Sequence, residues 1–262
     1  MIIVDQLNRR LTFKEPPKRI ISLVPSLTET LHFLNLDEEV VGITKFCVHP
    51  KEWKDSKTII GGTKKVNFKK IKNLKPDLII ANKEENTKEE IEELIKNYPV
   101  YISNIKSFKD LENFNTDIGL ITKEQEKAKT LNQSIKKVVC ETQNFFNSLG
   151  QNKVAYFIWQ NPFMLAGKDT FINHILNHIG FENIANTLKS RYPEVSINDI
   201  NPADIILLSS EPYPFKKKHL KDYSVQFNNS NIFIVDGEVF SWYGPRILLF
   251  TAELCRLKSL LN

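Results

Sequence analysis

Short apolar stretches alternate with amphipathic stretches along most of this chain. The apolar stretches, rich in Ile, Val and Leu, are typical of strands buried in a parallel sheet, and the amphipathic ones are typical of helices that cover it. In the first part of the chain we expect strands at 19–24, 40–43, 58–60, 77–81 and 100–103, and helices at 25–34, 67–73 and 86–97. At the start of the first helix, Ser26 and Glu29 have the spacing of a capping box. Alternation of strand and helix predicts an α/β fold.

A longer helical pattern follows. From Thr122 to Leu149 the chain has neither Pro nor Gly, and apolar residues recur at the spacing of one helix face. At 1.5 Å per residue, such a helix is on the order of 40 Å long, and we expect Gly150 to end it. The α/β alternation then resumes, with strands at 153–158, 204–208 and 232–235 and helices at 169–179 and from residue 244.

This organisation predicts two α/β lobes with central parallel sheets, joined by one long backbone helix, with a ligand cleft between the lobes. The boundaries that we expect are 1–115 for the N-terminal lobe, 116–150 for the linking helix and 151–262 for the C-terminal lobe. A single stiff helix between lobes restricts hinge opening, so only small closure motions are expected.

Two segments, one in each half of the chain, have nearly the same pattern. Residues 74–84 and 200–211 each run from a proline through an aspartate into an apolar stretch, and each reaches a glutamate seven residues after the aspartate. The aspartates are Asp77 and Asp204, and the glutamates are Glu84 and Glu211. The repeat predicts two strands that end at equivalent places, and ligands bind outside the carboxyl ends of parallel strands.

Charge and composition narrow the class of protein. With 262 residues, of which 41% are apolar, the chain is long enough to bury a sizeable core. The net charge is +5, from 36 basic and 31 acidic residues. Basic residues are scattered among acidic ones, and the compact run 216–218 is short enough to be a solvated turn or helix start, so we expect no nucleic-acid partner. We expect neither a membrane span nor an export signal, because no stretch approaches the roughly 20 apolar residues of a span.

Metal and catalytic motifs are weak. Cys47, Cys140 and Cys255 are widely spaced, which indicates neither a disulfide framework nor a CxxC metal site. His174 and His178 lie four residues apart on a predicted helix, but without a nearby catalytic motif we interpret them as surface histidines rather than metal ligands. The sequence has no GxSxG elbow, P-loop or GxGxxG fingerprint, so an enzyme is not expected.

Six motifs, in order along the chain, carry a resemblance to a known family. They are RIISLVPSLTE at 19–29, VGITKFCVHP at 41–50, IKNLKPDLIIA at 71–81, GKDT at 167–170, GFEN at 180–183 and GPR at 244–246. The chain resembles the helical-backbone periplasmic binding proteins that deliver cobalamin, haem and ferric siderophores to ABC importers, and within them the cobalamin-binding branch. The resemblance implies a monomer with one metal-chelate ligand, no intrinsic cofactor or metal, and a periplasmic location.

The resemblance also implies where an importer would dock. Proteins of this type place one exposed glutamate on each lobe, where the pair meets arginines of the importer's membrane permease. Glu84 and Glu211 are the residues that we expect in this role, because the repeat places them equivalently. Glu85 is a rival for the N-terminal position, and each glutamate could equally be an ordinary solvated residue.

Aromatic walls suit a flat corrinoid or porphyrin, because they bury a large area at small entropic cost. The loops after strands therefore supply the residues that we expect at the ligand: Phe46, His49, Thr63, Asn82, Trp159, Asn161, Phe163, Tyr192, Phe240, Trp242, Tyr243 and Arg246. The alternative for the aromatics is a place in the core. Arg246 could pair with a ligand carboxylate or phosphate, or cap the loop by bonding carbonyls.

The resemblance leaves the ligand open. Cobalamin binders often carry tryptophan on the N-terminal lobe, where this chain has Thr63 and Asn82, so its wall would be more polar. A corrinoid, haem and a ferric chelate all remain candidate ligands. Because the chain shows no export signal, a cytoplasmic carrier, sensor or enzyme of the same fold, acting on a corrinoid, haem or metal chelate, is the alternative function.

Overall fold

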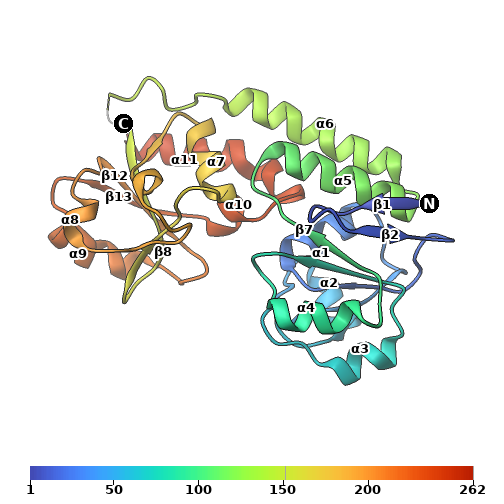
Figure 1. Ribbon diagram of the computed structural model, residues 1–262. Coiled ribbons are helices and arrows are strands. Elements are labelled where there is room, and N and C mark those ends of the chain that lie inside the picture. The colour runs from blue at the N-terminus through green and yellow to red at the C-terminus, as the bar shows by residue number, and fades with distance from the viewer. Residues whose placement is uncertain (151, 262) are drawn as a thin grey trace. The chain divides into compact units, whose positions relative to one another are not determined.

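The computed structural model describes residues 1–150 and 152–261, which form two compact units (Figure 1). The N-terminal unit comprises residues 1–135 and 243–245, and the C-terminal unit comprises residues 136–242 and the chain from Arg246 onward. Each unit is built on its own β-sheet. The expectation of an α/β protein with two sheet-based halves is confirmed.

The N-terminal unit contains five parallel strands in the order β5-β4-β3-β6-β7. These strands are β3 (Ile20–Ser22), β4 (Val40–Ile43), β5 (Thr58–Ile59), β6 (Leu78–Asn82) and β7 (Val100–Ser103). The helices are α1 (Pro25–Phe33), α2 (Lys51–Ser56), α3 (Phe68–Leu74), α4 (Lys88–Ile95) and α5 (Phe108–Thr122). A separate antiparallel hairpin consists of β1 (Ile2–Val4) and β2 (Arg10–Thr12). Every residue of β3, β6 and β7 is buried, as their continuous apolar runs predict.

The C-terminal unit has a mixed sheet in the order β11-β9-β8-β12-β13, with β10 also paired to β8. Its strands are β8 (Lys153–Trp159), β9 (Phe163–Leu165), β10 (Glu182–Asn183), β11 (Glu194–Val195), β12 (Ile205–Ser209) and β13 (Asn231–Val235). Its helices are α7 (Phe171–His178), α8 (Ile197–Ile200), α9 (Lys217–Gln226), α10 (Gly237–Ser241) and α11 (Phe250–Leu261), with 3₁₀ turns at Ile184–Thr187 and Pro245–Leu249. The core strands β8, β12 and β13 are parallel.

The long linking helix is shorter than expected. Helix α6 (Gln125–Thr142) has 18 residues, about 27 Å at 1.5 Å per residue, rather than the predicted span of 122–149. Lys123 takes a left-handed conformation that ends α5, and Asn144 does the same beyond α6. These asparagine and lysine breaks lack the Gly or Pro signal on which the prediction relied. The boundary between the two units falls within α6.

The expected capping box at the first helix is wrong. Val24 is the N-cap of α1, Pro25 occupies the first turn, and no side chain caps the helix. Proline suits this position because its missing N–H would lack an intrahelical partner anyway. Ser26 and Glu29 therefore lie within the helix, and Ser26 is buried.

The sequence repeat corresponds to a repeated set of hydrogen bonds. The Asp77 amide donates to the Arg19 carbonyl at 3.0 Å, and the Asp77 carboxylate accepts from the Arg19 amide at 2.8 Å. The Asp204 amide donates to the Lys153 carbonyl at 2.9 Å, and its carboxylate accepts from the Lys153 amide at 3.0 Å. Each aspartate thus joins the start of its own strand, β6 or β12, to the start of the central strand beside it, β3 or β8.

Candidate functional site

Three loops of the N-terminal unit meet at the carboxyl ends of their strands. The loop after β4 contacts the loop after β5, because the Lys45 amide donates to the Gly61 carbonyl at 2.8 Å. A Cβ added at Gly62 would lie 3.2 Å from the Phe46 ring, so the ring rests against this glycine. The Asn86 side chain, in the turn after β6, donates to the Thr63 carbonyl at 2.9 Å. The structure therefore places the loops that carry Phe46 and Thr63 next to each other, and the contact of these residues with a ligand stays a prediction.

Phe46 is an exposed aromatic in this group. Its side chain is 49% exposed, and the Lys45 ammonium lies 5.0 Å from the ring centroid. Exposure of a large ring at the carboxyl ends of parallel strands fits a ligand-contacting role, because such edges are where ligands bind in open sheets. His49 is half-buried on the same loop and is joined to Pro50 by a cis peptide bond.

Asn82 organises the turn that follows β6. It is 1% exposed, its Oδ1 accepts from the amides of Glu84 at 2.8 Å and Glu85 at 3.2 Å, and its amide nitrogen donates to the Ser103 hydroxyl at 3.0 Å. Such a turn is a common use of asparagine after a strand. A ligand contact is therefore not the role that the structure gives Asn82. Its side chain instead holds the two glutamates in place.

Glu84 and Glu85 differ in their surroundings within that turn. Both are half-buried. Burial raises the pKa of Glu85, and the nearby Glu84 carboxylate raises it further, whereas Lys64 lowers it. Desolvation disfavours the ionised form of an acid. The ionised form is therefore disfavoured at Glu85, the rival for the N-terminal position.

Glu211 occupies the equivalent place after β12, and the structure holds it tightly. The Ser209 hydroxyl donates to the Glu211 carbonyl at 2.6 Å, and the Ser241 hydroxyl donates to the Glu211 carboxylate at 2.5 Å. A Cβ at Gly237 would lie 2.6 Å from Cγ of Glu211, so only glycine allows this approach. Ser209 in β12 thus plays the part that Asn82 plays in β6.

Trp159 and Tyr213 form an exposed aromatic pair in the C-terminal unit. Trp159 ends β8 and is 40% exposed, and its ring meets the half-buried Tyr213 edge-on at 5.5 Å between centroids. The Tyr213 amide donates to the Ile158 carbonyl at 3.3 Å, which fixes the loop after Glu211 against the end of β8. Tyr213 is not among the ligand residues that we expected from the sequence. Its position two residues beyond Glu211, just after the second copy of the repeat, is the signal that points to it.

Segment 240–246 contradicts its expected role as an open ligand wall. Phe240 is fully buried between Tyr156 and Phe250, and Trp242, Tyr243 and Arg246 are each less than a tenth exposed. Arg246 lies over the Trp242 ring at 5.4 Å and pairs with Glu238 at 3.3 Å. The aromatic residues are core residues. Arg246, which the sequence assigned to a ligand or to loop carbonyls, is paired with the Glu238 carboxylate instead.

The remaining expected ligand residues have separate places. Phe163 packs against Phe157, Tyr223 and Phe227 at the edge of the core. Asn161 is exposed in a left-handed conformation after β8. Tyr192 is half-buried under the Arg191 guanidinium at 5.8 Å.

His178 has a structural role. Its Nε2 lies 2.9 Å from the Val139 carbonyl and 3.2 Å from the Thr142 hydroxyl, at the end of α6. Burial lowers the pKa of His178. Within residues 1–150 and 152–261, no group of three or more His, Cys, Asp or Glu side chains is arranged to hold a metal ion.

Comparison with known proteins identifies the family. The profile of the family described as periplasmic binding protein matches residues 20–223, which is most of the chain. The chain belongs to the periplasmic binding protein family. It is a substrate-binding protein of the kind that serves ABC transporters.

Several periplasmic binding proteins are similar along nearly the whole chain. An uncharacterised ABC transporter substrate-binding lipoprotein of Bacillus subtilis (strain 168) is 28% identical, over 96% of this chain and 83% of its own length. A vitamin B12-binding protein of Pectobacterium carotovorum is 24% identical, over 91% of this chain and 87% of its own length. A crystal structure from Staphylococcus epidermidis, described as a possible iron-binding periplasmic solute-binding protein, is 26% identical with a TM-score of 0.78, over 95% of this chain and 100% of that one.

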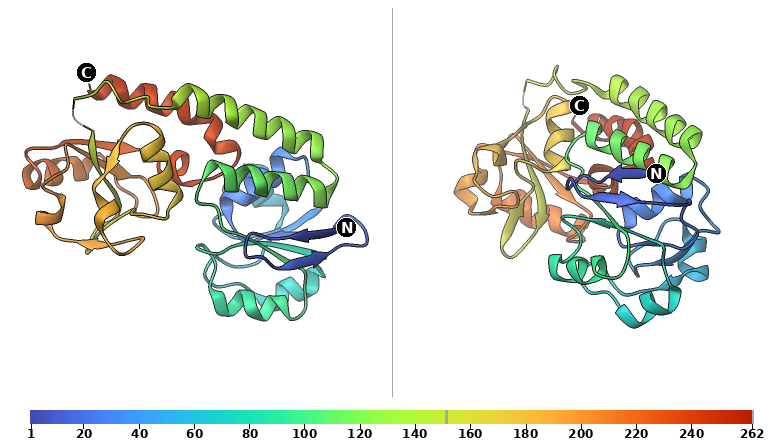
Figure 2. Two further views of the ribbon diagram at one scale, coloured as in Figure 1. Left: turned by 45° about the horizontal axis from the view of Figure 1, so that its top comes forward. Right: turned by 45° about the vertical axis from the view of Figure 1, so that its right-hand side comes forward.

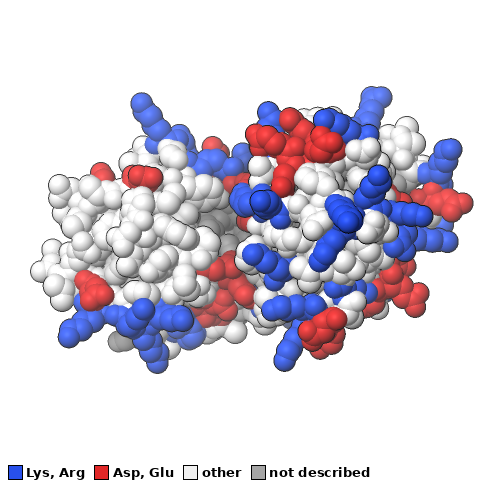
Figure 3. Space-filling view, turned by 90° about the horizontal axis from the view of Figure 1, so that it is seen from below, with Lys and Arg blue, Asp and Glu red and all other residues white. Residues whose placement is uncertain are grey.

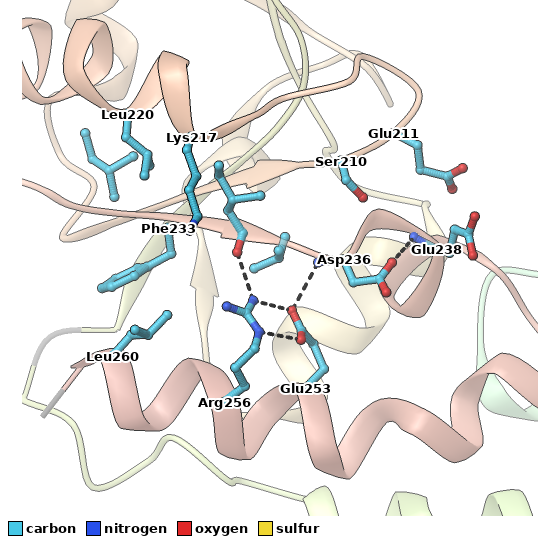
Figure 4. A pocket seen from close by; sticks show the side chains of 13 residues that line it. Ser210, Glu211, Lys217, Leu220, Phe233, Asp236, Glu238, Glu253, Arg256 and Leu260 are labelled. Carbon is cyan, nitrogen blue, oxygen red and sulfur yellow. Dashed lines mark hydrogen bonds and ion pairs between the residues drawn. The ribbon is translucent and has the colours of Figure 1, made fainter.

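This periplasmic binding protein has a cavity of about 970 Å³ beside Glu211, at the free edge of β13 (Figure 4). Leu220 and Leu260 contribute apolar walls from α9 and α11. At the mouth, Arg256 bonds the Ile234 carbonyl at 2.8 Å and pairs with Glu253 at 2.6 Å. The polar groups there bond one another, and we assign the cavity no ligand.

None of the helices among the described residues is both long enough and apolar enough to cross a bilayer.

Proposed function

We propose that this periplasmic binding protein binds a corrinoid or a related metal chelate and passes it to the membrane permease of an ABC importer. The observation that carries the ligand class is the exposure of two aromatic side chains at the carboxyl ends of parallel strands, Phe46 on the loop after β4 and Trp159 as the last residue of β8. Flat macrocycles gain most from such rings. The relatives described as vitamin B12-binding and iron-binding support the same ligand class.

Charge supports a ligand that carries anionic groups. The Lys45 ammonium lies beside the Phe46 ring, and Lys64 lies exposed on the next loop, where its ammonium bonds the Glu84 carbonyl at 2.5 Å. Corrinoids, haem and many ferric chelates present phosphate or carboxylate groups that such cations would favour. Thr63 and Lys45 together make the expected ligand-facing surface of the N-terminal unit more polar than tryptophan side chains would make it.

The importer contact is proposed at Glu84 and Glu211. Each glutamate lies two residues after the end of an equivalent strand, and each backbone turn is held by a side chain at that strand end. Carboxylates fixed in this way lose little freedom when they meet arginines of a permease, which favours an oriented and reversible contact.

The first test is a titration of the purified protein with cyanocobalamin, haemin and a ferric siderophore, followed by absorbance and by tryptophan fluorescence. We expect saturable binding of one of them, weakened about fivefold to tenfold in Trp159→Ala, since truncating an aromatic anchor typically costs 1 kcal/mol or more.

Phe68→Ala is the matched control, because Phe68 on α3 is similarly exposed, at 41%, and is not among the residues that we expect at the ligand. Equal weakening in both variants would contradict the proposed contact. The absence of binding to all three ligands would overturn the ligand class and leave the family assignment intact.

A further inference from the structure

One short segment of the N-terminal unit carries a larger positive charge than the net charge of the whole chain. Residues 64–75 contain six lysines and no acidic residue, whereas the net charge of the chain is +5, so the rest of the protein sums to −1. We call these six side chains the lysine face: Lys64, Lys65, Lys69, Lys70, Lys72 and Lys75. Apolar and asparagine residues interrupt the run, so the sequence by itself predicts scattered charge rather than a patch.

The fold turns all six lysines outward. Helix α3 is held by two apolar residues, Ile71, which is fully buried, and Leu74, for which Gly42 of β4 leaves room. A Cβ at Gly42 would lie 2.8 Å from Cδ1 of Leu74. Because only these two positions of α3 point inward, the rest of this short helix is exposed.

The hydrogen bonds that two lysines of this face make do not neutralise their charge. The Lys70 ammonium donates to the Ile59 carbonyl at 2.8 Å, and the Lys64 ammonium donates to the Glu84 carbonyl. Both partners are neutral backbone groups.

Acidic side chains also lie near this face, and the charge of Lys64 lowers the pKa of the neighbouring Glu85. Glu90 approaches it by accepting the Val66 amide at 2.9 Å. Two other carboxylates of α4 pair within their own helix region, Glu92 with Lys88 at 3.7 Å and Glu93 with Lys96 at 2.6 Å. Figure 3 views the side of the N-terminal unit on which α3 and α4 lie in Figure 1, and there Lys and Arg side chains are spread over the surface with patches of Asp and Glu around them.

An aromatic ring lies in the middle of this charge. Phe68, the first residue of α3, is 41% exposed and precedes Lys69 and Lys70. Clustered lysines with an exposed aromatic ring are the combination that attracts a protein to anionic lipid headgroups, where the ring enters the interface and the ammonium groups meet phosphates. A rigid polyanion would use the charge but would leave the ring in water.

We infer that the lysine face binds an anionic lipid surface. The contact between Lys64 and the Glu84 carbonyl makes this face continuous with the turn that carries Glu84. The purpose of lipid binding rests on the proposed function, since a protein that docks on a permease through Glu84 would meet the surrounding headgroups with the adjacent lysines. The lipid binding itself requires neither the importer nor the chelate.

Vesicle flotation tests this inference on the full chain. The probe is a vesicle of phosphatidylglycerol and phosphatidylcholine in equal parts, with pure phosphatidylcholine for comparison. We expect salt-sensitive binding to the anionic vesicle that is largely lost by about 0.5 M NaCl, because the Debye length is then on the order of 4 Å. A variant with all six lysines changed to Gln should bind at least about tenfold more weakly, and Phe68→Ala should weaken binding by a smaller factor.

A matched control carries the same loss of charge elsewhere. It changes six exposed lysines of α6 and α9 to Gln: Lys129, Lys136, Lys137, Lys217, Lys218 and Lys221. Retained binding in this control, with native circular dichroism in both variants, supports the lysine face. Equal loss in both variants, an absence of wild-type binding, or tighter binding to duplex DNA than to the vesicle would overturn the inference. None of these outcomes depends on whether the chelate titration succeeds.

Discussion

The hydroxyl of Ser241 donates a 2.5 Å hydrogen bond to the carboxylate of Glu211, which ties the turn after β12 to the last residue of α10. Hydrogen bonds to an ionised acceptor are among the stronger ones in proteins. Glu211 is therefore held at its carboxylate as well as at its backbone. The backbone of Glu84 is held at both its amide, by Asn82, and its carbonyl, by Lys64. The two proposed importer contacts are equivalent in position along their strands.

Importer docking should depend on each glutamate while chelate binding does not. We expect Glu84→Gln and Glu211→Gln each to lower the stimulation of ATP hydrolysis by the cognate importer about tenfold or more, because each removes a charged partner of an arginine. Chelate affinity should stay within about twofold of the wild-type value. The control is Glu141→Gln, which removes an exposed charge on α6. Undiminished stimulation with both Glu84→Gln and Glu211→Gln would refute the docking proposal.

Gly237→Ala should disturb the turn that carries Glu211. The added Cβ would lie 2.4 Å from the Ser209 hydroxyl and 2.6 Å from Cγ of Glu211. Overpacking of this kind costs typically 1–3 kcal/mol, measured as a lower free energy of unfolding in urea. Gly150→Ala is the control, because nothing lies within 4 Å of a Cβ there. Equal stability of the two variants would show that the turn moves aside without cost.

The paired aspartates at the strand starts should stabilise both units. Replacing Asp77 or Asp204 by Ala removes a carboxylate that accepts a backbone amide of the neighbouring strand. A loss of about 0.5–1.5 kcal/mol in the free energy of unfolding is expected for each, and the Asn variants should keep part of it because the amide oxygen still accepts. An Ala variant as stable as the wild type would show that water replaces the bond without loss.

His178 should make the protein less stable in mild acid. Burial lowers its folded-state pKa below the usual 6.5, so folding disfavours the protonated ring. The stability that the neutral ring contributes is complete above about pH 6.5 and is lost as the pH falls through the lowered folded pKa. Unfolding free energies measured from pH 7.5 to pH 5 should therefore fall more steeply for the wild type than for His178→Gln. Parallel curves would contradict the shift.

Asp117 should have the opposite effect on stability: it should make the protein less stable as the pH rises. Desolvation raises its pKa, although the Tyr101 hydroxyl, which donates to it at 2.7 Å, works against this. A raised folded pKa gives stability that is complete below the unfolded value of about 3.9 and is lost as the pH rises through the folded value. Asp117→Asn keeps an acceptor for Tyr101 and removes the charge, so its stability relative to the wild type should increase as the pH rises. An unchanged difference from pH 3 to pH 7 would count against this.

Local patterns predicted the strands well, because their apolar runs leave few alternatives. Residues 77–81 and 204–208 were assigned within one residue of β6 and β12. The helix ends were less accurate, since Lys123 ends α5 in a left-handed conformation that lysine rarely adopts, and the prediction relied on Gly150 rather than on Asn144, although asparagine can also end a helix in this way. The repeat was the most informative sequence feature, and it located Glu84 and Glu211 because a repeated unit folds into a repeated set of bonds.

The roles of the candidate ligand residues depended on exposure, which the sequence does not carry. An aromatic residue beside Ser, Gly and Pro has the composition of a loop, yet Phe240 is a core residue because Tyr156, distant in sequence, packs against it. Phe46 and Trp159 have the same side-chain chemistry and remain exposed.

The sequence by itself determined the class of fold, the family and the equivalence of the two strand-end glutamates, because these follow from periodicity and motif order. Only the tertiary structure decided which polar side chains bond other groups of the protein and which lie exposed on its surface. Asn82 and Arg246 are used internally, whereas the lysines of residues 64–75 form one outward face. The physical reason is that burial and charge compensation depend on neighbours in space, which residues far apart in the sequence supply.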